Sequence, residues 1–281
     1  MRLLIGGSPS KIFHLKEFED ALIKLGIECE LVIDTDICNG FPSRKILDWF
    51  QTQKKFDKLI SDFKPDVILV DRQRHFAKIA SKYKIPLIIH LRGNIWKEIE
   101  WAKHTTYKSF PKKLALQIWE KISKETFQKS SLITPICKHL DEITKENYPN
   151  KKTQVMYQGI TPERWYPQEG MQLKHPCVGL LQGVVIWGKA QEMLVLQKVL
   201  ESMPDVTFYW VGDGPYRGKI LPILEKYDNF EWLGPLQYPD KVREYLTEID
   251  VYALVSGIDM SPLTLQAVSY THLTLPTTPY V

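Results

Sequence analysis

The chain has 281 residues, 44% hydrophobic and 25% charged, a composition typical of a soluble globular protein with enough length for two domains. No apolar run reaches the ~18 residues of a membrane-spanning helix, and MRLLIGGSPSK at the start is too short in its apolar part for a secretory signal. A net charge of +4 is too weak to indicate nucleic acid as a partner. We therefore expect a cytoplasmic protein, with peripheral membrane contact as an alternative.

The first half of the chain alternates strand and helix signals. Its helices are predicted from apolar residues at helical spacing at 15–25, 46–63, 75–83 and 136–147. Short apolar runs predict strands at Arg2–Ile5, Cys29–Ile33, Val67–Val70, Pro86–His90, Ser131–Thr134 and Gln154–Tyr157. This alternation predicts an α/β domain with a doubly wound parallel sheet.

A second α/β series follows a Gly- and Pro-containing loop at 158–168. It predicts strands at Val178–Leu181, Val206–Val211, Phe230–Leu233 and Val251–Val255, with helices at 189–200, 218–226 and 240–246. We expect an N-terminal domain at 1–158, a linker at 159–170 and a second domain at 171–267.

The last residues, 268–281, differ in character from the rest. SYTHLTLPTTPYV has no charge and no periodicity, and it interrupts a helix that is predicted to begin at Pro262. VSYTHLTLPT resembles the translation of a sequencing-library adaptor. We expect a non-native tail, with native sequence ending near Gln266 and the second domain incomplete; the alternative is a natural disordered tail.

Six short motifs follow one another in a characteristic order. They are GGSPS, VMYQGITPERWYP, GLLQGVVIWGKAQEML, VGDGP, FEWLGPL and DVYALVSGIDMSPLTLQ. In this order and spacing, over residues 1 to 267, the chain resembles the family 4 glycosyltransferases. The resemblance implies the GT-B fold, with two Rossmann-like domains facing a cleft. It also implies that a sugar moves from a nucleoside diphosphate to a hydroxyl of a carbohydrate or lipid-linked acceptor, with retention and without a metal or other cofactor.

Three residues are expected to be catalytic. Lys189 opens the first helix of the second domain, where a cation and helix-terminal N–H groups stabilise a diphosphate leaving group. Asp259 matches the family's first acidic position, near the sugar, and His90 matches a position that contacts the sugar. The alternatives are a solvent-facing lysine, a turn aspartate and a structural histidine.

Other contacts follow from the same resemblance. Donor-side contacts are expected from Gln182, Gly212, Gly214, Leu233, Ser261, Pro262 and Leu263. Acceptor-side contacts are expected from Gly6, Gly7, Ser10 and Arg92, with Lys11, Asp71 and Arg72 as weaker candidates. The glycines of both sets would also serve plain tight turns.

The sequence departs from the family at two positions. Gln182 or a neighbour stands where the family has an arginine. Ala267, eight residues after Asp259, stands at the second acidic position and cannot bind the ribose hydroxyls. Both departures keep open a second hypothesis, a non-catalytic protein on the same fold that binds nucleotide sugars or carbohydrates.

Two further patterns favour other functions. Asp34-Thr35-Asp36 is a DxD motif that could hold a divalent metal, but it follows a strand of the acceptor domain. Aromatic residues alternate with lysines over Trp96–Lys129, as in segments that contact anionic membranes, although two helices covering the sheet would show the same pattern.

Two kinds of motif are absent from the sequence. There is no GxGxxG motif, so a dinucleotide-dependent oxidoreductase is not indicated. The four cysteines form no CxxC and no Cys/His pair at common zinc spacing, so no metal site is predicted.

Overall fold

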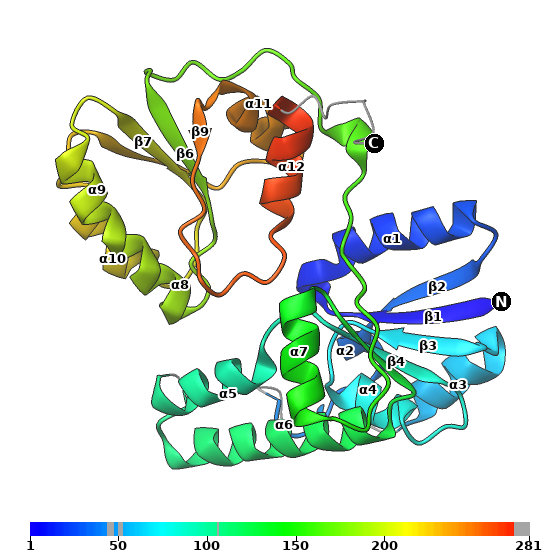
Figure 1. Cartoon of the computed structure of the whole chain (residues 1–281). Helices are drawn as coiled ribbons and strands as arrows, with labels where there is room; N and C mark the ends of the chain where they lie inside the picture. The colour runs from blue at the N-terminus through cyan, green and yellow to red at the C-terminus, as the bar shows by residue number, and fades with distance from the viewer. Residues whose placement is uncertain (44–47, 50–52, 106, 273–281) are drawn as a thin grey trace. The chain divides into compact units, whose positions relative to one another are not determined.

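The computed structural model describes residues 1–43, 48–49, 53–105 and 107–272. The chain divides into two compact units, Met1–Gly159 and Ile160–Val281, each built around a parallel sheet (Figure 1). None of the described helices is both long and apolar enough to span a bilayer.

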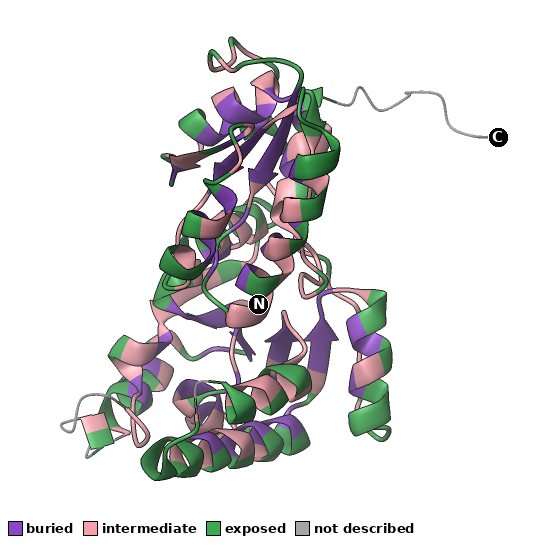
Figure 2. Ribbon diagram, turned by 90° about the vertical axis from the view of Figure 1, so that its left-hand side faces the viewer, coloured by how far each residue is buried: buried purple, intermediate pink, exposed green. Residues whose placement is uncertain are grey.

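Unit 1 has a five-stranded sheet in the order β2-β1-β3-β4-β5. Its strands are β1 (Arg2–Gly7), β2 (Glu28–Ile33), β3 (Val67–Val70), β4 (Leu87–Leu91) and β5 (Leu132–Pro135). Its α-helices are α1 (Ile12–Lys24), α2 (Asp34–Ile37), α3 (Lys54–Phe63), α4 (His75–Ala80), α5 (Ile95–His104), α6 (Phe110–Lys129) and α7 (Lys138–Asn147). The central strands are buried along most of their length, as expected when helices cover both faces of a parallel sheet (Figure 2).

Unit 2 has a four-stranded sheet in the order β8-β7-β6-β9. Its strands are β6 (Cys177–Leu181), β7 (Thr207–Val211), β8 (Phe230–Gly234) and β9 (Val251–Tyr252). Its α-helices are α8 (Trp187–Glu192), α9 (Leu196–Ser202), α10 (Arg217–Leu224), α11 (Asp240–Glu248) and α12 (Leu263–His272). Trp210 of β7 is fully buried in one core cluster, and Tyr209 lies in a second. This alternation gives the sheet two buried faces.

The α/β class with two doubly wound parallel sheets is confirmed, but several element boundaries are wrong. The predicted strand at 154–157 is absent, because this segment meets β5 only through isolated backbone bonds, such as that from Gln154 N–H to Ile133 O. β9 ends at Tyr252 instead of Val255. The helix expected at 189–200 is divided by a 3-10 turn at Met193–Val195. Part of the helix expected at 46–63 lies outside the described residues, and α3 begins at Lys54.

The predicted interruption of the last helix is also wrong. α12 continues to His272, because Ala267 and Thr271 lie on its buried face and the helix packs against α11. The foreign origin expected for 268–281 stays a prediction.

Two glycines allow the loops after β6 and β7 to pack together. Gly212 has a φ of +147°, and a Cβ there would lie 2.1 Å from the backbone oxygen of Gln182. A Cβ on Gly214 would lie 2.6 Å from the backbone of Val184. These contacts involve backbone atoms, so they could not be relieved by a side-chain rotation.

We predict that Gly212→Ala destabilises unit 2 by about 1–3 kcal/mol, because the substitution adds a strained φ and a backbone clash. Gly218→Ala is the matched control. Gly218 is exposed on α10 with nothing near its Cβ position, so alanine there should be neutral or stabilise by up to about 1 kcal/mol. Urea unfolding of both variants is the measurement, and equal stabilities would contradict the packing described.

Candidate functional site

The sheet order of unit 2 marks one place where a ligand is expected. From β6 the chain moves outward through β7 to β8 and then returns to β9 on the other side of β6. In open α/β sheets, ligands bind at the carboxyl ends of the strands where the order reverses in this way. The loops after Leu181 and Tyr252 are therefore the candidate site of this unit (Figure 1).

An ion pair joins these two loops. The Lys189 ammonium on α8 contacts the carboxylate of Asp259, which lies in the loop between β9 and α12. Their side chains keep 19% and 24% of their exposure, so a ligand from solvent can reach both. Two residues that the sequence predicts to be catalytic, 70 positions apart, are thus brought into direct contact.

A second contact between the same elements involves a residue that the sequence analysis missed. The carboxylate of Glu192 accepts the backbone N–H of Gly257 at 3.1 Å. Glu192 lies three positions after Lys189 on α8, so both side chains project from one face of the helix. The Lys-x-x-Glu spacing is the feature of the sequence that places Glu192 beside Lys189 on a helix.

Gln182 lies between these elements and the sheet, with 6% of its surface exposed. Its Nε2 donates to the Lys189 backbone oxygen at 3.2 Å, and its own backbone oxygen accepts the indole N–H of Trp210 at 2.9 Å. Its buried Oε1 has no hydrogen-bond partner among the described residues. This neutral amide ties α8 to the sheet and supplies no positive charge for a diphosphate; its donor contact stays a prediction.

The first residue of α10, which follows the loop after β7, is a basic residue that was also missed. Arg217 contacts both carboxylate oxygens of Asp213, at 3.0 and 2.9 Å, and its guanidinium lies 4.6 Å from the ring centre of Trp232. The Trp232 indole N–H donates to Gly212 O at 2.8 Å. Gly212 and Gly214 are thus explained by loop packing, while Leu233 packs against the core. The carboxyl ends of β7 and β8 are held by one aromatic and charged cluster.

The start of α12 follows the loop that holds Asp259. Ser261 and Pro262 precede Leu263, the first residue of the helix, so N–H groups of its first turn lack partners within the helix. Ala267 lies one turn further along with 3% exposure, in a core cluster with Tyr245 and Ile249. The position at which the resemblance places a second acidic residue is therefore packed into the interior.

The acceptor-side candidates of unit 1 gather at the carboxyl edge of its sheet. Arg92 donates to the buried Asp71 carboxylate at 3.0 Å and to the side chain of Gln158. The Asp71 N–H in turn donates to Gly6 O at 3.0 Å. Arg92 is thus already partnered by a buried carboxylate. Ser10 is exposed, and its hydroxyl lies 3.5 Å from that of Ser8.

Gly6 and Gly7 have a packing role. A Cβ on Gly6 would lie 2.5 Å from the Phe76 ring, and one on Gly7 would lie 2.2 Å from the Leu15 side chain. The glycines let α4 and α1 approach β1. This contact accounts for both glycines without a ligand, and their acceptor contact stays a prediction.

His90 is buried on β4, with 6% of its surface exposed. Its Nδ1–H donates to Thr134 O on β5 at 2.8 Å, and burial lowers its pKa to about 4, so the ring is neutral near neutral pH. This geometry supports the structural alternative, in which His90 joins two strands. Its contact with a sugar stays a prediction.

The DxD motif lies at α2, directly after β2. Asp34 is buried, its carboxyl pKa is raised by burial, and the group that could share a metal ion does not include Asp34 or Asp36. Neighbouring positive charge comes from Arg74 and Arg72.

No protein-family model and no curated protein matches the sequence, but solved structures share its fold. A TarM variant of S. aureus with fondaparinux, α-GlcNAc-glycerol and UDP matches with a TM-score of 0.56 and 13% identity. The match covers 78% of this chain but 42% of TarM, so this chain spans less than half of that protein. The lipopolysaccharide outer core galactosyltransferase WaaB gives 0.58 and 12%, covering 96% of this chain and 78% of WaaB. UDP-GlcNAc 2-epimerase from Methanocaldococcus jannaschii gives 0.53 and 14%, over 90% and 78% of the two chains.

These likenesses confirm a fold of the GT-B type. They do not identify the reaction of this chain, because transferases and an epimerase share the fold. The choice depends on the residues of this chain, and the cleft expected between its domains stays a prediction.

The buried His90 predicts a pH dependence of stability. Its folded pKa of about 4 lies below the ordinary 6.5, so the unfolded chain takes up the proton first as the pH falls. The stability associated with neutral His90 is present above pH ~6.5 and is lost as the pH falls toward ~4. Between about pH 7.5 and about pH 5, His90 alone should cost about 2 kcal/mol of unfolding free energy.

His90→Asn should lose about that much less over the same pH range, measured by urea unfolding, because Asn keeps a donor for Thr134 O but does not titrate. The exposed His139→Asn is the control and should follow the wild type. An H90N variant as pH-sensitive as the wild type would exclude this account.

Proposed function

We propose that the chain is a glycosyltransferase that moves a hexose-type sugar from a nucleoside diphosphate to an acceptor hydroxyl. The observation that carries this proposal is the Lys189–Asp259 pair at the switch point of unit 2. It combines a cation for the leaving diphosphate with a carboxylate for the sugar, both accessible and both held by α8 and its loop contacts.

The proposed roles of Lys189 and Asp259 follow from the charges of their side chains. A diphosphate carries more negative charge than one carboxylate and should displace Asp259 from Lys189. Lys189 and the N–H groups at the starts of α8 and α12 then stabilise the charge that develops on the leaving phosphate. The released Asp259 carboxylate accepts hydrogen bonds from sugar hydroxyls. Since these groups supply positive charge and hydrogen-bond donors to the phosphate, we propose metal-independent transfer, with retention as the resemblance implies.

This exchange predicts opposite effects of two substitutions on UDP binding. Lys189→Met should weaken binding about tenfold or more, because it removes a charge-assisted contact worth about 1.5–3 kcal/mol. Asp259→Asn should leave UDP binding unchanged or tighter, because it removes the competitor for Lys189, while turnover of the UDP-sugar falls. Calorimetry with UDP and an assay of UDP release are the measurements.

Lys198→Met is the matched control, since Lys198 is exposed on the neighbouring α9. K189M binding UDP as tightly as K198M would remove the proposed role of Lys189. GDP is the parallel probe for the base. Retained turnover in the presence of a chelator would support the metal-independent reaction.

A second candidate is a non-catalytic binder of nucleotide sugars. It is favoured by the inward amide of Gln182 and the buried Ala267, which leave the site without the cation and the second carboxylate of the resembling family. UDP binding at the Lys189 site without release of UDP from any common UDP-sugar, with carbohydrate acceptors supplied, would select this candidate over the enzyme.

For the acceptor, we propose a lipid-linked molecule at an anionic membrane surface. The support comes from α6, where Phe110 and Leu114 are 81% and 43% exposed beside the exposed Lys112 and Lys113. Apolar side chains next to lysines are typical of segments that contact anionic membranes.

The double variant Phe110→Ser, Leu114→Ser should reduce co-sedimentation with vesicles rich in phosphatidylserine by several-fold. Val195→Ser, which removes an exposed apolar side chain from unit 2, should not. Equal sedimentation of wild type and double variant, or none with either, would count against membrane contact through α6.

A further inference from the structure

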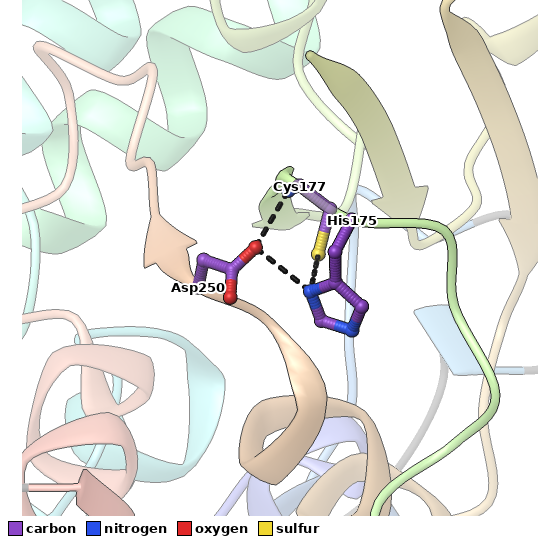
Figure 3. A group of neighbouring side chains, drawn as sticks. All are labelled: His175, Cys177 and Asp250. Atoms are coloured by element: carbon purple, nitrogen blue, oxygen red, sulfur yellow. Dashed lines mark hydrogen bonds and ion pairs between the residues drawn. The ribbon is translucent and has the colours of Figure 1, made fainter.

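A second group of reactive side chains lies at the opposite edge of the unit 2 sheet. Strands β6 and β9 run parallel with Val178 beside Val251, so the preceding residues, Cys177 and Asp250, face each other at the amino ends. His175 enters this edge from the segment before β6 (Figure 3). A five-residue strand spans about 16 Å, which separates this edge from the loop that leads to Lys189.

The three side chains converge on one point. His175 Nδ1 lies 2.8 Å from Asp250 Oδ2 and 3.7 Å from Cys177 Sγ, and one ligand atom from each residue falls within 4.8 Å of the others (Figure 3). Ligand atoms around a tetrahedral zinc ion are about 3.3–3.6 Å apart, given bonds of about 2.0–2.3 Å. The Sγ–Nδ1 spacing already fits, and the Nδ1–Oδ2 spacing needs to open by about half an ångström.

Surrounding contacts hold these ligand atoms in place. His175 Nε2 lies 2.9 Å from Glu248 Oε1, an arrangement in which the ring donates Nε2–H to the carboxylate and directs Nδ1 toward Cys177 and Asp250. The backbone N–H of Cys177 donates to Asp250 Oδ2 at 2.7 Å. A carboxylate behind a histidine is the usual second contact of metal-binding imidazoles.

An ion pair between His175 and its two carboxylates accounts for the imidazole, while the Cys177 side chain belongs to a core cluster beside it. Cys177 is 1% exposed, and its Sγ lies 3.7 Å from the His175 ring nitrogen that also faces Asp250. Sulfur, imidazole and carboxylate together form a donor set that suits zinc and is unsuited to magnesium or calcium.

We propose that His175, Cys177 and Asp250 form a zinc site, with Glu248 as the positioning residue behind His175. Binding places the metal between Sγ, Nδ1 and an Asp250 oxygen, and the protons of Nδ1 and the thiol leave to solvent. A water completes the fourth position. The ion joins the segment before β6 to the α11–β9 connection, so its role is to stabilise unit 2 rather than to act on a sugar.

Cobalt binding to the full chain is the direct test, because a thiolate–Co²⁺ bond gives a near-ultraviolet charge-transfer band. We expect this band in the wild type and its displacement by Zn²⁺. It should be absent in Cys177→Ser and weakened at least tenfold in apparent affinity in His175→Gln. The exposed position of His175 makes H175Q independent of any folding defect in C177S. Cys137→Ser and His139→Gln are the controls and should behave as the wild type.

Glu248→Ala should weaken Zn²⁺ binding about 10–100-fold without removing the band, as expected for a residue that acts through His175. Zn²⁺ should also raise the Tm of the wild type but not that of Asp250→Asn. A wild type without the band, or a band that persists unchanged in C177S or H175Q, would overturn the site. Each readout is independent of sugar transfer.

Discussion

The contact between α8 and the loop after β9 is the interaction on which the proposed site depends. Lys189 pairs with Asp259. Glu192, three positions after Lys189 on α8, accepts the backbone N–H of Gly257. One contact is an exchangeable charge pair and the other fixes the loop backbone. A diphosphate can therefore take Lys189 while Glu192 keeps the loop in place, so the site is preorganised before the ligand arrives.

The sheet topology explains why these residues meet. β9 returns to pair with β6, so two loops that are distant in sequence leave the same edge of the sheet side by side. The same pairing brings Cys177 and Asp250 together at the opposite edge. A single strand pairing thus brings together the residues of both proposed sites, one for a diphosphate and the other for zinc.

Patterning alone predicted the two parallel sheets, because buried runs such as Val67–Val70 are difficult to place elsewhere. The resemblance to a family singled out Lys189 and Asp259, and the structure brings them into contact, while their catalytic roles stay a prediction. Glu192 and Arg217 were not predicted as site residues, because their partners, Gly257 N–H and the Trp232 ring, become neighbours only in the fold. The grouping of His175 and Cys177 with Asp250 was not predicted. One residue separates His175 from Cys177, which is not a common zinc spacing, and Asp250 lies 73 positions after Cys177. The glycines at 6 and 7 were open to two interpretations, and the close approach of Phe76 and Leu15 favours packing.

The most direct test of the central claim is amide hydrogen–deuterium exchange of the full chain with and without saturating UDP. The account predicts slower exchange in two segments, 182–192 and 253–264, because the diphosphate orders both sides of the Lys189–Asp259 contact. K189M should lose this protection at equal UDP concentration. Protection confined to other segments, or none with UDP or GDP, would contradict a nucleotide site at this switch point.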